Sequence, residues 1–141
     1  MGIDEYLETA RKGLRRLTPR EAWAAVSSGA YLVDTRPESQ RRRDGEVPGA
    51  VVVERNQLEW RLDPLCEARI PEATSPAVRW IVLCDQGYSS SLAAAVLRRI
   101  GLAHATDVIG GFQAWRAAGM PSLRLRVPAP PRGPGQGADH L

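Results

Sequence analysis

Four short apolar runs, separated by stretches with helical periodicity, constrain the fold of this chain more than any other feature. The runs are rich in valine and isoleucine and comprise residues 31–33, 51–53, 81–83 and 107–109. Apolar runs of this length are typical of strands that are buried on both faces of a parallel sheet. The sequence therefore predicts a layered α/β fold, and its 141 residues match the size of one domain.

Helix signals occupy the N-terminal part of the chain. Residues 3–14 place apolar side chains at helical spacing between charged ones, which predicts an amphipathic helix packed outside the main sheet. Thr18 and Glu21 then form a capping box around a proline at the first helical position. We expect this second helix to run to about residue 28 and to end at Gly29.

Cys84 ends the third apolar run and is followed by a short glycine-containing loop and a helix that begins near Ser89 or Ser90. In open α/β sheets the functional sites lie at the carboxyl ends of strands, where Cys84 stands. The unpaired N–H groups and the positive dipole end of the helix would stabilise an anion in the loop, such as a thiolate. One hydroxyl among Ser89, Ser90 and Ser91 is expected to cap this helix. The sequence thus favours a reactive cysteine, with a small apolar residue that closes a buried strand as the alternative.

Composition and charge exclude several classes of partner. The chain has two cysteines, Cys66 and Cys84, and no recognisable signal peptide, which predicts a reducing, cytoplasmic environment. Its longest apolar run, residues 92–97, is far shorter than the roughly 20 residues that a membrane-spanning helix needs, so we expect no membrane partner. The net charge is +3, but no expected helix carries basic residues along one unbroken face, which speaks against a nucleic-acid partner. The arginine run at residues 41–43 fits a solvated helix face.

Four segments, in order along the chain, have the pattern of a known family. Residues 32–38 (LVDTRPE) hold an Asp-x-Arg element, and residues 45–50 (GEVPGA) hold a Pro-Gly turn before a strand. Residues 84–89 (CDQGYS) form a six-residue loop that opens with cysteine, and residues 110–115 (GGFQAW) hold a Gly-Gly-x-x-x-Trp element. Over about residues 18–121 the chain resembles a single-domain rhodanese, which is a sulfurtransferase fold.

The resemblance implies a three-layer α/β domain in which helices flank a central parallel sheet. This rhodanese-like domain would span residues 18–124, with the N-terminal helix of residues 1–17 packed on it. Residues 125–141 are rich in proline and glycine and poor in apolar side chains, which predicts a disordered tail.

Several of the matching residues have structural roles that follow from their chemistry. Asp34 and Arg36 are expected to form a charge-assisted pair that holds the following loop in place. Gly110 and Gly111 permit a tight approach of the backbone to its neighbours, and Trp115 is expected to bury its ring in the core. None of these residues needs to touch a substrate.

The resemblance implies sulfur transfer through a covalent intermediate on Cys84. The thiolate would attack the outer sulfur of a small donor, such as thiosulfate or another persulfide, and become a persulfide itself. A thiol or a cyanide-like acceptor would then remove this sulfur, and an acceptor protein is a further partner of this class. The active loop would bind the anionic outer sulfur through its amides, and it comprises Asp85, Gln86, Gly87, Tyr88, Ser89 and Ser90. The scheme requires no metal and no organic cofactor, and the sequence offers no histidine or cysteine cluster for a metal site.

Asp85 departs from the family pattern, because many thiosulfate-using members have a basic residue directly after the cysteine. A carboxylate at this position repels a dianionic donor and opposes the thiolate, which speaks against thiosulfate as the physiological donor. Arg55 and Arg61 could reach over the loop as substrate-binding groups and offset Asp85. Ordinary surface ion pairs with Glu54 or Glu59 are the alternative and the more common role.

Glu46 and Cys66 also need an interpretation. Glu46 stands where the family often has histidine, and we interpret it as a surface change without catalytic meaning. Cys66 could attack the persulfide as a resolving thiol, or it could be a bystander in a loop, which is the more common role of a lone second cysteine.

Other function classes stay open beside an active sulfurtransferase. The fold could serve as a catalytically weak protein-binding or regulatory module, an interpretation that Asp85 keeps open. A cysteine phosphatase of the related cell-cycle type needs an arginine six residues after the nucleophile, where this chain has Ser90. A Ser-His-Asp hydrolase has little support, because the only histidines are His104, expected on a surface loop, and His140. The cysteine at position 84 therefore favours sulfur transfer.

Overall fold

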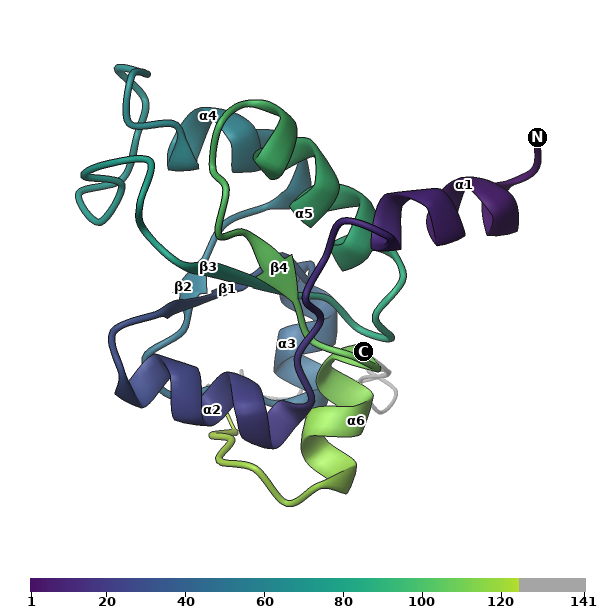
Figure 1. Ribbon diagram of the computed structural model, residues 1–141. Helices are drawn as coiled ribbons and strands as arrows, with labels where there is room; N and C mark the ends of the chain where they lie inside the picture. Colours follow the sequence, from purple (N-terminus) through teal and green to yellow (C-terminus); the bar gives the residue numbers. More distant parts are fainter. Residues whose placement is uncertain (125–141) are drawn as a thin grey trace, which may run out of the picture.

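A parallel sheet of four strands forms the centre of the computed structural model, which describes residues 1–124 (Figure 1). The strands are β1 (Tyr31–Asp34), β2 (Val51–Val52), β3 (Trp80–Leu83) and β4 (Thr106–Asp107), and they pair in the order β2-β1-β3-β4. All pairings are parallel, so the prediction from the four apolar runs is confirmed. The tail expected to be disordered, residues 125–141, lies outside the described residues.

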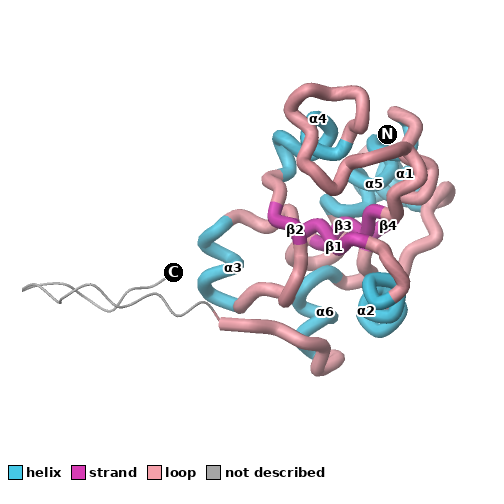
Figure 2. Tube along the Cα trace, turned by 90° about the vertical axis from the view of Figure 1, so that its left-hand side faces the viewer, coloured by secondary structure: helices cyan, strands magenta, loops and turns pink. Residues whose placement is uncertain are grey.

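Helices cover both faces of this sheet. They are α1 (Ile3–Arg11), α2 (Pro19–Ser27), α3 (Glu38–Asp44), the 3-10 helix η1 (Arg55–Gln57), α4 (Leu58–Leu62), α5 (Ser89–Arg99) and α6 (Gly111–Ala117). Figure 2 shows α1, α4 and α5 on one side of the sheet and α2, α3 and α6 on the other. The expected three-layer arrangement is confirmed. Within residues 1–124, no helix has the length and apolar character that crossing a membrane requires.

The strands contribute alternating side chains to two apolar clusters, one on each face of the sheet. Val33 and Val82 lie in the cluster that α4 and α5 cover, whereas Leu32, Ile81 and Leu83 lie in the cluster that α2 and α6 cover. This alternation follows from the two-residue repeat of a strand. Because both faces are buried, β3 is apolar at all of its positions and β1 is apolar up to Asp34, which explains the continuous runs in this part of the sequence.

The helix signals at the N-terminus predict the starts of helices better than their ends. The capping box is present, with the Glu21 amide donating to Thr18 Oγ1 at 3.2 Å and the Thr18 amide donating to Glu21 Oε1 at 2.9 Å. Helix α1 ends at Arg11, three residues earlier than expected, because a turn through Gly13 follows and glycine is a poor helix former. As expected, α1 packs outside the sheet, against α5 (Figure 1).

Strand β4 ends at Asp107 instead of residue 109, although the Val108 amide still donates to the Val82 carbonyl of β3 at 3.1 Å. On its other edge this segment pairs with the linker between α1 and α2. The Leu17 amide donates to the Asp107 carbonyl at 3.0 Å, and the Ile109 amide donates to the Leu17 carbonyl at 2.8 Å. The linker therefore runs alongside β4. Arg16, which precedes Leu17, is brought to the carboxyl end of the sheet by this pairing.

Truncation of a buried leucine on α5 should destabilise the fold, whereas truncation of an exposed leucine should not. Leu97 is fully buried, and Leu65 is 92% exposed. We expect Leu97→Ala to lower the free energy of unfolding by about 2–5 kcal/mol, because it removes apolar contacts and leaves a cavity. Leu65→Ala should change it by less than about 0.5 kcal/mol. Urea unfolding followed by circular dichroism measures both values, and equal effects of the two variants would contradict the described core.

Candidate active site

Cys84 lies directly after β3, at the carboxyl end of the sheet, and is 5% exposed. Its sulfur accepts two backbone N–H groups, from Gly87 at 3.1 Å and from Ser90 at 3.4 Å. The sulfur is therefore not enclosed by hydrocarbon alone, because two amide dipoles point at it. Such donors stabilise negative charge on the sulfur, which is the arrangement expected for a reactive cysteine.

The other residues of the predicted active loop differ in exposure. Gln86, Tyr88 and Ser89 are exposed, and Asp85 is half-buried. Tyr88 is the residue directly before α5, and it is 59% exposed. Among the described residues, the contacts to the sulfur come from the inner side of the loop, while these side chains form its outer side.

The loop closes against the start of α6 through backbone hydrogen bonds. The Phe112 amide donates to the Cys84 carbonyl at 2.8 Å, and the Gln113 amide donates to the Asp85 carbonyl at 3.1 Å. A Cβ atom at Gly111, whose φ is +61°, would lie 2.5 Å from the Cys84 carbonyl oxygen. The predicted tight approach at the Gly-Gly pair is confirmed, and the neighbour that it admits is the cysteine loop itself.

The prediction that a serine hydroxyl caps α5 is wrong. None of the serines at its start caps the helix, since the residue at the N-cap position is Tyr88 and it makes no side-chain cap. The hydroxyls of Ser90 and Ser91 instead donate to Asp107 Oδ2, at 2.7 Å and 2.8 Å. Asp107 is fully buried, and a buried carboxylate needs hydrogen-bond donors more than an exposed helix end needs a cap.

Two arginines from the N-terminal segment contact the loop, and sequence reasoning missed both. Arg16 pairs with Asp107, with Nε to Oδ1 at 2.9 Å, and its Nη2 donates to the Gly87 carbonyl at 3.1 Å. Arg11 Nη2 donates to the same carbonyl at 2.7 Å, and its Nε donates to Ser91 Oγ at 3.0 Å. No sequence signal marks these arginines, because they precede the matching motifs and belong to an ordinary charged pattern. Asp107 was likewise expected only as part of a strand.

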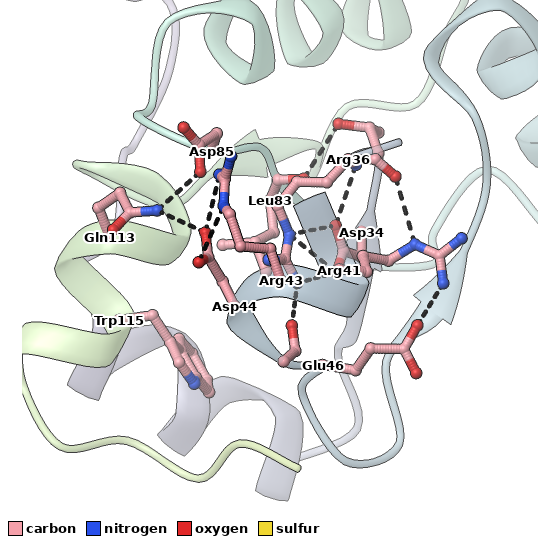
Figure 3. A network of polar contacts seen from close by, with 12 residues as sticks. Asp34, Arg36, Arg41, Arg43, Asp44, Glu46, Leu83, Asp85, Gln113 and Trp115 are labelled. Carbon is pink, nitrogen blue, oxygen red and sulfur yellow. Dashed lines mark hydrogen bonds and ion pairs between the residues drawn. The ribbon is translucent and has the colours of Figure 1, made fainter. Parts of the chain in front are cut away.

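Asp85 is anchored by Gln113, a further residue that the sequence did not indicate. Gln113 Nε2 donates to Asp85 Oδ1 at 2.8 Å and to Asp44 Oδ2 at 3.1 Å, so the side chain amide bridges two carboxylates (Figure 3). Arg43 in turn bonds Asp44, with Nη2 to Oδ2 at 3.0 Å, and this contact raises the pKa of Arg43. The bond from Arg43, with help from the Gln113 amide, holds the pKa of Asp44 below its ordinary value.

The Asp34–Arg36 pair is confirmed as a buried structural contact. Arg36 is 2% exposed and donates to both oxygens of Asp34, with Nη2 to Oδ2 at 2.7 Å. The same Nη2 donates to the Gly45 carbonyl at 2.8 Å, and the guanidinium stacks 3.8 Å from the centre of the Phe112 ring. The pair thus ties β1 to the turn before β2, as expected. The ring of Trp115 is fully buried, as also expected.

Glu46 has a structural role, which corrects its interpretation as a surface change. It is half-buried, and its carboxylate pairs with Arg41 on α3 (Figure 3). Its backbone forms an antiparallel bridge with Leu123. Arg41 also donates to the Arg36 carbonyl at 3.3 Å, so the arginine run at 41–43 is not wholly a solvated face.

Arg55 and Arg61 contact residues of their own segment. Arg55 Nη1 pairs with Glu59 Oε1 at 2.8 Å, which is the ordinary ion pair that we weighed for it. Arg61 donates to the Ala68 carbonyl at 3.1 Å and to Gln57 Oε1 at 3.4 Å. Within residues 1–124, neither arginine makes a hydrogen bond to the Cys84 loop, so these contacts do not support a substrate-binding role.

The remaining candidate residues lie apart from the Cys84 loop in the sequence and make no bond to it. Cys66 is a half-buried free thiol in the loop after α4, and Cys84 is also free. His104 lies on an exposed turn between α5 and β4, as expected. The part of the chain that the structure describes holds no group of three or more side chains that could bind a metal ion.

Comparison with known sequences identifies relatives over most of the chain. The family model for the rhodanese-like domain matches residues 18–118. A thiosulfate sulfurtransferase, GlpE, from Pseudomonas savastanoi pv. phaseolicola is 31% identical over 103 residues, which cover 73% of this chain and 88% of the relative.

Solved structures have the same fold. A protein of unknown function from Rhodopseudomonas palustris, described as a possible tyrosine phosphatase, has a TM-score of 0.79 and 32% identity, covering 87% of this chain and 95% of its own. The polysulfide-sulfur transferase homodimer from Wolinella succinogenes has a TM-score of 0.65 at 23% identity, covering 84% of this chain and 85% of its own. The second likeness shows the fold alone.

The variant Asp44→Asn should make the protein less sensitive to acid. The bonds from Arg43 and Gln113 lower the pKa of Asp44, so its carboxylate contributes stability above the ordinary carboxyl pKa of about 4. This contribution is lost as the pH falls through the lowered pKa of the folded state. Urea unfolding at about pH 6 and about pH 3 should therefore show a smaller acid loss for Asp44→Asn than for the unchanged protein. An equal acid loss in both would exclude this role of Asp44.

Proposed function

The chain belongs to the family of rhodanese-like domains, and we propose on this basis that it is a sulfurtransferase that carries sulfane sulfur as a persulfide on Cys84. The observation that supports this most is the pair of amides, from Gly87 and Ser90, directed at the sulfur of a cysteine that ends a central strand. The names of the relatives, which are thiosulfate sulfurtransferases, support the same reaction class.

In the first step the Cys84 thiolate attacks the sulfane sulfur of the donor, and a new S–S bond forms at Sγ. The bond that joined this sulfur to the rest of the donor breaks, and the leaving group departs with the electron pair. The leaving group is the sulfite dianion when the donor is thiosulfate, and it is a thiolate when the donor is a persulfide. The protein keeps one negative charge, which now resides on the outer sulfur of the persulfide.

In the second step a thiolate or cyanide acceptor attacks that outer sulfur. The acceptor becomes a persulfide or thiocyanate, and Cys84 leaves with the electron pair of the broken S–S bond as a thiolate. The charges balance in both steps, and neither needs an external oxidant, a metal or a cofactor. A reducing compartment such as the cytoplasm suits this chemistry, because it keeps thiols available as acceptors.

The amides around Sγ supply the electrostatic part of this proposal. The charge on Cys84 appears at the start and at the end of each cycle, when the cysteine is a thiolate. N–H groups that are already in place stabilise such a charge without the cost of reorienting dipoles during the reaction. The amides of the loop from Asp85 to Ser90 are proposed to bind the outer sulfur while the persulfide is present.

A second candidate function is phosphoryl transfer, which the description of the Rhodopseudomonas palustris protein brings into view. A cysteine phosphatase depends on a cation that binds the phosphoryl oxygens at the sixth residue after the nucleophile. Here this residue is Ser90, and its hydroxyl bonds the buried Asp107. Sulfur transfer is therefore the better-supported function. We expect the unchanged protein to hydrolyse p-nitrophenyl phosphate no faster than the variant Cys84→Ser does.

Mass spectrometry of the intact protein and of its peptides tests the proposal directly. After incubation with thiosulfate or with a small persulfide, the protein should gain about 32 Da on the peptide that contains Cys84 and lose it on treatment with cyanide. Cys66→Ser should gain the same mass, and Cys84→Ser should gain none and form no thiocyanate. Equal thiocyanate formation by the unchanged protein and Cys84→Ser would exclude the catalytic role, and absence of the mass gain would favour a protein-binding module.

The charge of Asp85 should decide which donor is preferred. Its carboxylate is held beside the loop by the neutral amide of Gln113, which anchors the charge without cancelling it. A dianionic donor is repelled more than a monoanionic persulfide, so we propose that a persulfide is the better donor. Asp85→Asn should raise kcat/KM for thiosulfate by about threefold to tenfold and change it less for a monoanionic persulfide. A parallel change with both donors would contradict this selectivity.

A further inference from the structure

The Gly87 carbonyl accepts hydrogen bonds from two guanidinium groups, although it is a neutral backbone oxygen. Arg11 Nη2 lies 2.7 Å from it and Arg16 Nη2 lies 3.1 Å from it. Both arginines precede residue 18, where the match to the family model begins. We call this pair, Arg11 and Arg16, the arginine clamp.

The arginine clamp belongs to one hydrogen-bond network with the start of α5. Arg16 bonds both oxygens of Asp107, at 2.9 Å and 3.2 Å, and Asp107 in turn accepts the hydroxyls of Ser90 and Ser91. Arg11 Nε donates to Ser91 Oγ at 3.0 Å and so closes the network. Every bond in it lies in a half-buried or buried position, where polar contacts are stronger than on the surface.

This network ends on the two residues whose amides contact the cysteine. Gly87 is held through its carbonyl and Ser90 through its hydroxyl, and these same residues donate their N–H groups to Cys84 Sγ. Gly87 has a φ of +85° and no side chain of its own to limit its conformation. A bond to its carbonyl therefore limits the loop in a way that the glycine itself cannot.

The clamp is itself held by the fold. Leu17, next to Arg16, pairs with β4 on both sides of Val108, and Arg11 forms the last turn of α1, which packs against α5 (Figure 1). The Arg11 guanidinium also lies 5.8 Å from the centre of the Tyr88 ring. In addition, Asp107 balances the charge of Arg16, whereas no carboxylate among residues 1–124 forms an ion pair with Arg11. The network thus adds a net positive charge beside the loop.

We propose that Arg11 and Arg16 are positioning residues for the sulfur-transfer site. They hold the Cys84 loop so that the Gly87 and Ser90 amides stay directed at the sulfur, and the N-terminal segment is thereby a working part of the site. The catalytic consequence, a stabilised thiolate and persulfide, rests on the proposed function. The positioning itself does not, because the state of the thiol can be measured without turnover.

Alkylation of Cys84 by iodoacetamide tests the proposal in the full chain. The rate is measured on the Cys84 peptide at about pH 7 and at about pH 10, and the ratio of the two rates reports the share of thiolate independently of access. Arg11→Ala should lower this ratio about threefold, and the double variant Arg11→Ala with Arg16→Lys should lower it further. Arg16→Lys keeps a cation beside the buried Asp107, which guards against a failure to fold.

Arg15→Ala is the matched control, because it removes the same charge from the same N-terminal segment. The Arg15 side chain makes no hydrogen bond within the described residues, so the ratio should equal that of the unchanged protein. The proposal is overturned if Arg11→Ala and the double variant keep the ratio of Arg15→Ala while remaining folded by circular dichroism. The circular-dichroism criterion is needed because a general loss of structure would also lower the ratio, since an unfolded cysteine has its ordinary thiol pKa.

The outcome is separable from that of the proposed function. Should the unchanged protein accept no sulfur on Cys84, sulfur transfer fails, yet the alkylation ratios still decide whether the clamp positions the loop. If the protein does accept sulfur, Arg11→Ala should lower kcat more than it changes KM, and Arg11→Lys should restore part of the loss, since lysine can still donate one bond to the Gly87 carbonyl.

Discussion

The geometry of the cysteine depends on one backbone contact, between the loop after β3 and the start of α6. The carbonyls of Cys84 and Asp85 accept amides of α6, so the loop turns these oxygens away from its interior. Because a peptide unit is planar, these two bonds also fix the directions of the Asp85 and Gln86 N–H groups. A side chain at Gly111 would collide with the Cys84 carbonyl oxygen, which ties the shape of the loop to a single residue far along the chain.

Features of the fold that depend on neighbouring residues could be predicted from the sequence. The Asp34–Arg36 pair joins residues two positions apart, and the apolar runs of the sequence predict the strands. The polar network around Asp107 could not be foreseen, because its bond to Arg16 joins residues 91 positions apart. The expected serine cap is wrong for the same reason. Capping preferences consider only residues close in the sequence, whereas the Ser90 hydroxyl bonds the buried carboxylate of Asp107 on β4.

The two sides of the loop carry different charged groups. On the α6 side, Asp85 shares an amide of Gln113 with Asp44 (Figure 3). Asp44 pairs with both Arg43 and Arg116, whereas Asp85 forms no ion pair within residues 1–124. On the α1 side stands the arginine clamp, whose charge Asp107 offsets in part. An anionic donor that approaches the loop thus meets an uneven field, and its orientation relative to the sulfur follows from where its own charge is concentrated.

The pairing of Leu17 with β4 has a consequence for association between molecules. β4 is the last strand in the order β2-β1-β3-β4, and such a strand exposes unpaired backbone groups to which a strand of another chain can add. The linker occupies these groups, because the Asp107 carbonyl and the Ile109 amide both bond Leu17. The segment that reaches the cysteine loop therefore also shields the open border of the sheet, so that its loss would favour self-assembly through β-strand addition.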